Sequence, residues 1–204
     1  RGEAVKVINV DKCGLERKCY RTQNQIENTF PDSLEDDEYE VFFHGTSQKH
    51  AKDLIESGID LRKGAKAQDF SDGDGFYLSK HFDEALKWAR HRHVSFAVLM
   101  FRLKKTELRG INNEKGYDLR EPAKRKKWQG VIKQFRSGKP DKKFRKEMNQ
   151  FYQFIEGPMA SLSRKNPNFS FAVPKDDSYQ ICVREKYCAE LFDYSLHSLV
   201  FLDK

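Results

Sequence analysis

The sequence has few cysteines and no long apolar run. Its four cysteines lie far apart and form no Cys-X-X-Cys pair: Cys13, Cys19, Cys182 and Cys188. This scatter argues against a disulfide scaffold and favours reduced thiols in an intracellular protein, nuclear or cytoplasmic; a zinc site with His50 or His197 is the alternative. No apolar stretch approaches the ~20 residues that a membrane span needs, and no signal-peptide pattern is visible, so we expect no membrane partner.

Charge is unevenly distributed along the chain, which carries a net charge of +7. Eleven Lys or Arg residues against one acid, Asp141, lie within residues 124–146, whereas residues 32–40 are strongly acidic. A basic block attracts phosphate, either in a nucleic acid or in a dinucleotide. Its aromatic residues Trp128, Phe135 and Phe144 suggest stacking on single strands. The alternative is a solvated loop with no partner.

Short strand and helix patterns alternate along most of the chain and predict an α+β fold. Residues 1–39 indicate an N-terminal extension or linker, and residues 40–204 a single domain. The chain begins with Arg rather than Met, so we expect it to be part of a longer protein. Ser47 and Ser79 are expected to cap two helices, and only one helix is expected in the basic block. Strands are expected at residues 39–43, 75–79, 94–103, 169–173, 179–183 and 197–202.

The sequence His44-Gly45-Thr46 follows the first of these strands. At neutral pH a histidine there can make one directed hydrogen bond without carrying full charge. A glycine lets a ligand lie directly on the backbone N–H and C=O, which suits an amide such as nicotinamide. Tyr77 and Trp88 can then stack on a flat ring. Taken singly, however, a histidine such as His44 at a strand end is more often structural, and a tryptophan such as Trp88 on a helix is usually a core residue.

His44-Gly45-Thr46, followed by Gly-Asp-Gly-Phe-Tyr-Leu-Ser at residues 73–79, resembles the first two motifs of the PARP-like, or diphtheria-toxin-like, ADP-ribosyltransferases. The resemblance implies two small packed β-sheets, antiparallel or mixed, flanked by short helices, with NAD as co-substrate and no metal ion. It places Gly45, Thr46, Gly75 and Phe76 around the cofactor. Trp88 stands where the family has a nicotinamide-stacking aromatic residue. Ala85 replaces a frequent serine and removes one hydrogen bond to nicotinamide.

The last part of the chain resembles a branch of the same superfamily that is often described only as domains of unknown function. "FIEGPMA" and "YQICVREKYCAELF" carry this likeness. It aligns the third catalytic position, usually Glu, with Gln180, and makes Glu156 the second candidate carboxylate. A glutamine can orient a ribose by hydrogen bonds but cannot act as a base. Synthesis of long poly(ADP-ribose) chains is therefore not expected.

The resemblance implies an NAD-dependent mono-ADP-ribosyltransferase that modifies a protein or a nucleic acid and releases nicotinamide. His44, Tyr77 and Gln180 would be its catalytic residues. The alternative is a non-catalytic module on the same fold that binds ADP-ribose, a nucleic acid or a protein. A third interpretation is an RNA 2′-phosphotransferase. That activity needs a set of arginines that contact the RNA phosphate, and the sequence shows no matching motif.

Overall fold

The computed structural model describes residues 6–9, 34–161 and 172–203, and these fall into two compact units. Of the described residues, unit 1 comprises 6–9, 34–58, 78–107 and 191–203, and unit 2 comprises 59–77, 108–161 and 172–190. The architecture is α+β, with small mixed sheets and six α-helices among the described residues, so the predicted fold class is confirmed. No helix in the described part of the chain has the length and apolar composition of a membrane span.

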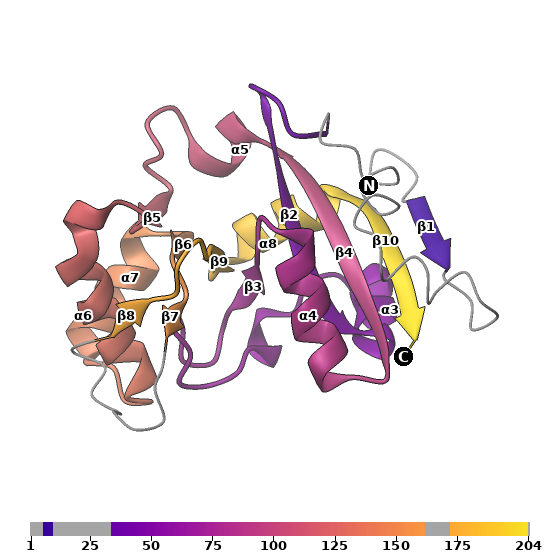
Figure 1. Ribbon diagram of the computed structural model, residues 1–204. Helices are drawn as coiled ribbons and strands as arrows, with labels where there is room; N and C mark the ends of the chain where they lie inside the picture. Colours follow the sequence, from indigo (N-terminus) through magenta and orange to yellow (C-terminus); the bar gives the residue numbers. More distant parts are fainter. Residues whose placement is uncertain (1–5, 10–33, 162–171, 204) are drawn as a thin grey trace. The chain divides into compact units, whose positions relative to one another are not determined.

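Unit 1 is built on a four-stranded sheet with the strand order β1-β10-β4-β2 (Figure 1). The strands are β1 (Lys6–Asn9), β2 (Tyr39–Ser47), β4 (Ser95–Lys104) and β10 (Leu196–Asp203). Only the β1–β10 pair is parallel. Six consecutive residues of β4, from Phe96 to Phe101, are buried, as expected for a central strand covered on both faces.

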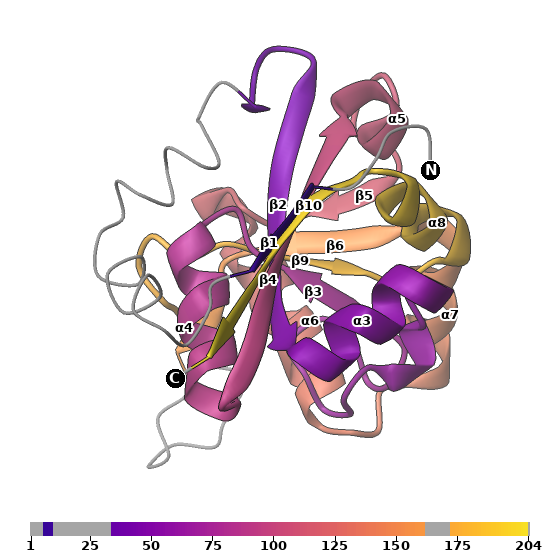
Figure 2. The same ribbon diagram turned by 90° about the vertical axis from the view of Figure 1, so that its right-hand side faces the viewer.

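Helices α3 (Gln48–Ser57) and α4 (Phe82–Arg92) cover opposite faces of this sheet, as Figure 2 shows. Ser47 caps α3 by accepting a hydrogen bond from the His50 N–H, as predicted, and Gly58 ends it with φ 81°. The cap expected of Ser79 is wrong: the residue before α4 is His81, whose side chain makes no cap bond. The Ser79 hydroxyl instead donates to Glu84 and accepts from the His81 N–H.

Unit 2 contains a second mixed sheet with the strand order β3-β9-β6-β5. These strands are β3 (Phe76–Leu78), whose last residue belongs to unit 1, β5 (Gly116–Asp118), β6 (Phe154–Gly157) and β9 (Gln180–Val183). A two-stranded sheet pairs β7 (Ala160–Ser161) with β8 (Val173–Pro174). The strand expected at residues 169–173 falls mostly outside the described residues, as do most of residues 1–39.

The basic block is more helical than expected, because it forms α6 (Arg125–Arg136) and the first half of α7 (Lys142–Phe151). Trp128, Val131, Ile132 and Phe135 recur at helical spacing, and their burial holds α6 in the core of unit 2. Phe144 packs against the same core. The prediction that these aromatic residues stack on a single strand is therefore wrong for Trp128 and Phe135, since each is only 1% exposed.

The remaining helices are short connections. They are α5 (Lys105–Arg109), α8 (Lys186–Tyr194), and the 3₁₀ turns η2 (Leu61–Lys63) and η3 (Pro122–Lys124). In unit 1, Phe192 of α8 packs its ring against Phe42 and Phe101, with centroids 5.7 Å away in each pair. These contacts fill the face of the first sheet that is opposite α4.

Candidate functional site

The free edge of β2 presents the backbone of Gly45. Phe43 exchanges two hydrogen bonds with Ser79 across this edge, N–H to O at 2.7 Å and the reverse bond at 2.8 Å. In an antiparallel ladder, residues two apart direct their N–H and C=O groups to the same side. Gly45 therefore points both groups away from β4, just beyond the Phe43–Ser79 pair. A donor and an acceptor side by side on one residue are what a carboxamide needs.

Close packing against α4 explains why position 45 is a glycine. A Cβ atom on Gly45 would lie 2.0 Å from the Ala85 carbonyl oxygen and 3.1 Å from the Ala89 Cβ. Helix α4 therefore lies directly on β2 at Gly45. The two positions that the resemblance assigns to the carboxamide, 45 and 85, are thus in contact within unit 1. Ala85 itself is 5% exposed and has no polar side-chain atom to offer.

His44 and Thr46 belong to the other face of β2. Side chains alternate along a strand, and Phe43 packs on Phe82 of α4 while Phe42 packs on Phe192. His44 consequently shares its face with Phe42, away from α4, and is half-buried. Thr46 is buried on that face too.

Trp88 is the exposed aromatic residue of α4. Its side chain is 48% exposed, although Ala85 and Ala89 on either side of it are buried against the sheet. The Arg92 guanidinium carbon lies 3.2 Å from the ring centroid, and Arg92 Nη1 donates to the Trp88 carbonyl oxygen. This cation–π contact holds the indole in place on the surface. Trp88 is therefore not a core residue, which was the structural alternative.

In unit 2, Tyr77 and Gln180 lie on neighbouring strands, β3 and β9. The Tyr77 hydroxyl accepts from the Phe70 N–H at 3.0 Å and bonds the Ser71 hydroxyl at 2.8 Å. Burial raises the pKa of Tyr77 well above its usual value, so this phenol stays protonated. Gly75, ahead of it, leaves room for Ser71 and Cys182, whose side-chain atoms lie under 3 Å from where a Cβ would be. Phe76 is buried beside them.

A buried carboxylate, Asp69, orients Gln180. Gln180 Nε2 donates to Asp69 Oδ2 at 2.7 Å, and both residues are less than 10% exposed. Asp69 also accepts from the Ala160 N–H at 3.0 Å and pairs with the Arg136 guanidinium at 2.6 Å. Within the described part of the chain, the Gln180 amide forms hydrogen bonds to Asp69 and to the Pro158 carbonyl, and Nε2 donates both. The amide oxygen is thereby left as the acceptor for another group.

Glu156 is fully buried in an ion-pair network of its own. Arg109 donates to both of its oxygens, at 2.7 and 2.8 Å, and Arg120 approaches within 3.2 Å. The Tyr179 hydroxyl adds a fourth bond at 2.7 Å. A carboxylate with this many donors and no exposed surface holds β5, β6 and β9 together. This arrangement suits a structural ion pair better than a catalytic base.

The structure thus groups the candidates by unit. Gly45 and the helix of Trp88 meet in unit 1, and Tyr77, Gln180 and Asp69 gather in unit 2. Sequence reasoning missed Asp69, because its contact with Gln180 spans 111 positions and nothing in the sequence separates it from Asp72 and Asp74 in the same loop. Among the described residues, no three His, Cys, Asp or Glu side chains are placed to bind a metal; Cys13 and Cys19 lie outside them.

Comparison with known families gives one informative result. The profile of a family described as a protein of unknown function, DUF3990, matches residues 41–166, which is more than half of the chain. The match contains the motifs around His44, Gly75 and Trp88 as well as Glu156, and it ends before Gln180. A search of curated proteins gives no match. The chain belongs to the DUF3990 family of proteins of unknown function.

Proposed function

We propose that this protein is an NAD-dependent mono-ADP-ribosyltransferase. The observation that carries the proposal is the Gly45 edge: an outward N–H and C=O, on a glycine packed against the helix that bears an exposed Trp88. A nicotinamide carboxamide bonds both backbone groups, and the tryptophan offers a ring for stacking. The residues present therefore fit the nicotinamide end of NAD, even without a serine at Ala85.

Unit 2 supplies the chemistry that follows binding. The bond between nicotinamide and ribose loosens toward an oxocarbenium ion, so the protein's part is to position the sugar and stabilise charge. The amide oxygen of Gln180 accepts a hydrogen bond from a ribose hydroxyl. Asp69 orients the amide group, because it accepts a hydrogen bond from Nε2. The resemblance assigns His44, in unit 1, a polar contact to a ribose hydroxyl. No carboxylate acts as a base here, which favours transfer of one unit to an acceptor that is already nucleophilic.

A direct test uses NAD labelled in the adenosine moiety, with mixed protein, RNA and DNA acceptors. The wild-type protein should label an acceptor and release nicotinamide. Trp88→Ala should lose at least tenfold in rate without losing stability, because its ring is half exposed. Tyr194→Ala, a truncation of another exposed aromatic residue of unit 1, should have no effect. Equal rates for the two variants would contradict the assigned role of Trp88.

The second candidate, a non-catalytic ADP-ribose-binding module, is favoured by one specific observation. Both buried carboxylates of unit 2, Asp69 and Glu156, are occupied by Arg, Tyr and amide donors. ADP-ribose binding without nicotinamide release under any acceptor condition would establish this module in place of the enzyme.

A further inference from the structure

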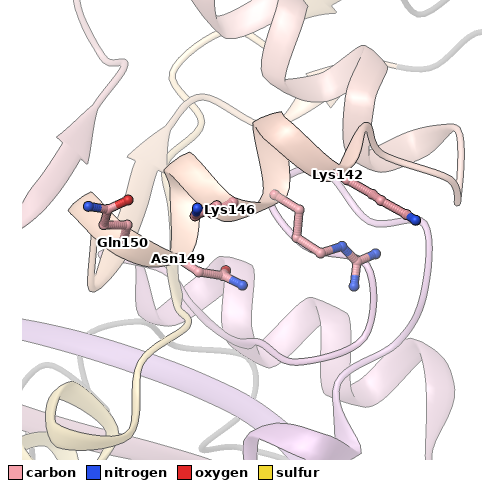
Figure 3. A pocket seen from close by; sticks show the side chains of 5 residues that line it. Lys142, Lys146, Asn149 and Gln150 are labelled. Carbon is pink, nitrogen blue, oxygen red and sulfur yellow. The ribbon is translucent and has the colours of Figure 1, made fainter.

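Helix α7 bears a depression whose lining consists of basic and amide side chains. Five residues on α7 line an open depression of about 710 Å³, and Figure 3 shows its labelled side chains projecting from this helix. We call it the α7 basic face: Lys142, Arg145, Lys146, Asn149 and Gln150. Three of these residues are cations and none is an acid. The face therefore concentrates positive charge in a shallow, open site.

Beneath this face lies a guanidinium group with unmet hydrogen-bonding capacity. Arg184 Nη2 donates to Asn149 Oδ1 at 3.0 Å, and its guanidinium carbon lies 4.8 Å from the centroid of the Phe135 ring. Its Nε and Nη1 atoms are buried and meet no acceptor among the described residues. Buried donors in proteins are normally satisfied, and an exception calls for a bound ion or water. Asn149, held by Arg184 through its oxygen, keeps its NH₂ group for a ligand.

Electrostatics at this place also call for an anion. Burial lowers the pKa of Arg184, the nearby groups Cys182, Tyr77 and Asp74 raise it, and the charge of Arg145 lowers it further. Arg145 itself has one acidic partner, Asp72, at 3.1 Å, and its side chain remains 47% exposed. Two like charges held close together are destabilising by themselves, and an anion bound over them offsets that repulsion.

The surroundings favour a polymer of phosphates over a single anion. Helix α6 has no acidic residue, and its exposed cations continue the charge of α7: Arg125, Lys126, Lys127 and Lys133. A nucleic acid carries about one negative charge per 1.7 Å of duplex axis, which matches closely spaced cations better than the scattered carboxylates of a peptide. Trp128 and Phe135 are buried, so they do not stack on bases. The basic block therefore does not use them to recognise a base sequence.

We propose that the α7 basic face binds the phosphate backbone of a nucleic acid, with Lys142, Arg145 and Lys146 contacting phosphates and Arg184 supporting Asn149 from beneath. This binding needs no NAD and stands apart from ADP-ribosyl transfer. It is independent of base sequence, since its contacts are to phosphates alone.

The test measures binding of the full chain to a labelled 20-mer of mixed sequence, single- and double-stranded, by fluorescence anisotropy at several salt concentrations. Replacing Lys142, Arg145 and Lys146 by Gln should weaken binding at least tenfold at low salt. It should also reduce the slope of log K against log salt by about 2 to 3, the value for three lost phosphate contacts. The matched control replaces Lys49, Lys63 and Lys66, three exposed lysines elsewhere, by Gln and should change the slope by less than 1.

Asn149→Asp separates binding from folding. A carboxylate at 149 gives Arg184 an ionic partner, so the melting temperature should rise, while its charge repels phosphate and affinity should fall at least threefold. Asn112→Asp, the same charge change at an exposed loop position, should leave affinity within twofold. Equal slopes for the triple variant and its control would overturn the proposal. Binding confined to polyglutamate or to phosphatidylserine vesicles would overturn it as well.

Discussion

Replacing Gly45 by Ala tests the packing on which the candidate site depends. The new Cβ would lie 2.0 Å from the Ala85 carbonyl oxygen and 2.8 Å from its carbonyl carbon. Both are backbone atoms, so no change of rotamer relieves the clash. Helix α4 must retreat from β2 by about 1 Å to restore an allowed contact. The backbone of Gly45 does not have positive φ, and the effect is therefore steric.

The magnitude follows from two opposing contributions. Overpacking of this kind costs about 1–3 kcal/mol, and the lower chain entropy of Ala in the unfolded state returns about 0.4–1 kcal/mol. A net loss of about 1–2 kcal/mol lowers the melting temperature of a chain of this size by roughly 2–8 °C. Affinity for nicotinamide should fall too, because the retreat of α4 moves Trp88 away from the Gly45 edge.

Thermal melts followed by circular dichroism give the comparison, with Gly130→Ala as the matched control. Gly130 lies inside α6, and a Cβ there meets nothing within 4 Å. That substitution should stabilise the protein by about 0.5–1 kcal/mol, since glycine is a poor helix residue. The two variants are therefore expected to shift the melting temperature in opposite directions. A Gly45→Ala protein that melts at or above the wild-type temperature would refute the reasoning.

Three further perturbations follow from the contacts of unit 2. Tyr77→Phe removes the acceptor of a backbone N–H and should lower the free energy of unfolding by about 1–3 kcal/mol in urea titrations; a change below 0.5 kcal/mol, on the order of measurement error, would exclude a structural role for the hydroxyl. Asp69→Asn leaves Arg136 without its anion and should cost about 2–3 kcal/mol after allowance for the partly exposed guanidinium, and Asp69→Asn combined with Arg136→Met should recover part of this loss. Burial raises the pKa of the Cys182 thiol to about 11, so the folded state retains a proton that the unfolded state loses at lower pH. The contribution of Cys182 to the free energy of unfolding should therefore be constant below about pH 9 and fall between about pH 9 and 11; a fall of equal size in Cys182→Ala would assign the effect to other groups.

Local sequence signals predicted the elements around the Gly45 edge. The apolar run before His44 and the cap at Ser47 each act over a few residues, and the structure confirms both. The helix that carries Trp88 was also predicted, although its start was not, because the two hydrogen bonds of Ser79 replace a side-chain cap. These features depend on backbone geometry and helical periodicity, which a sequence records directly.

Long-range contacts explain what the sequence could not reveal. In the basic block, the sequence predicted a helix around Trp128 to Phe135, which is α6, but α7 was taken for a loop. Only Met148 of α7 is buried, so this helix has no apolar stripe to mark it in the sequence. The Asp69–Gln180 bond and the Arg109–Glu156 pair join residues 111 and 47 positions apart. Nothing local distinguishes Asp69 from other acids in its loop, and nothing local shows that the donors around Glu156 occupy both of its oxygens.

Nicotinamide titrated into ¹⁵N-labelled protein gives the most direct measurement, because the Gly45 N–H is itself the proposed ligand contact. The expected result is a saturable shift of the Gly45 amide resonance, accompanied by a shift of the Trp88 indole signal. The shift of the Gly45 resonance should be absent in Trp88→Ala. An unchanged Gly45 resonance at saturating nicotinamide and NAD would contradict the assignment of this edge as the nicotinamide site.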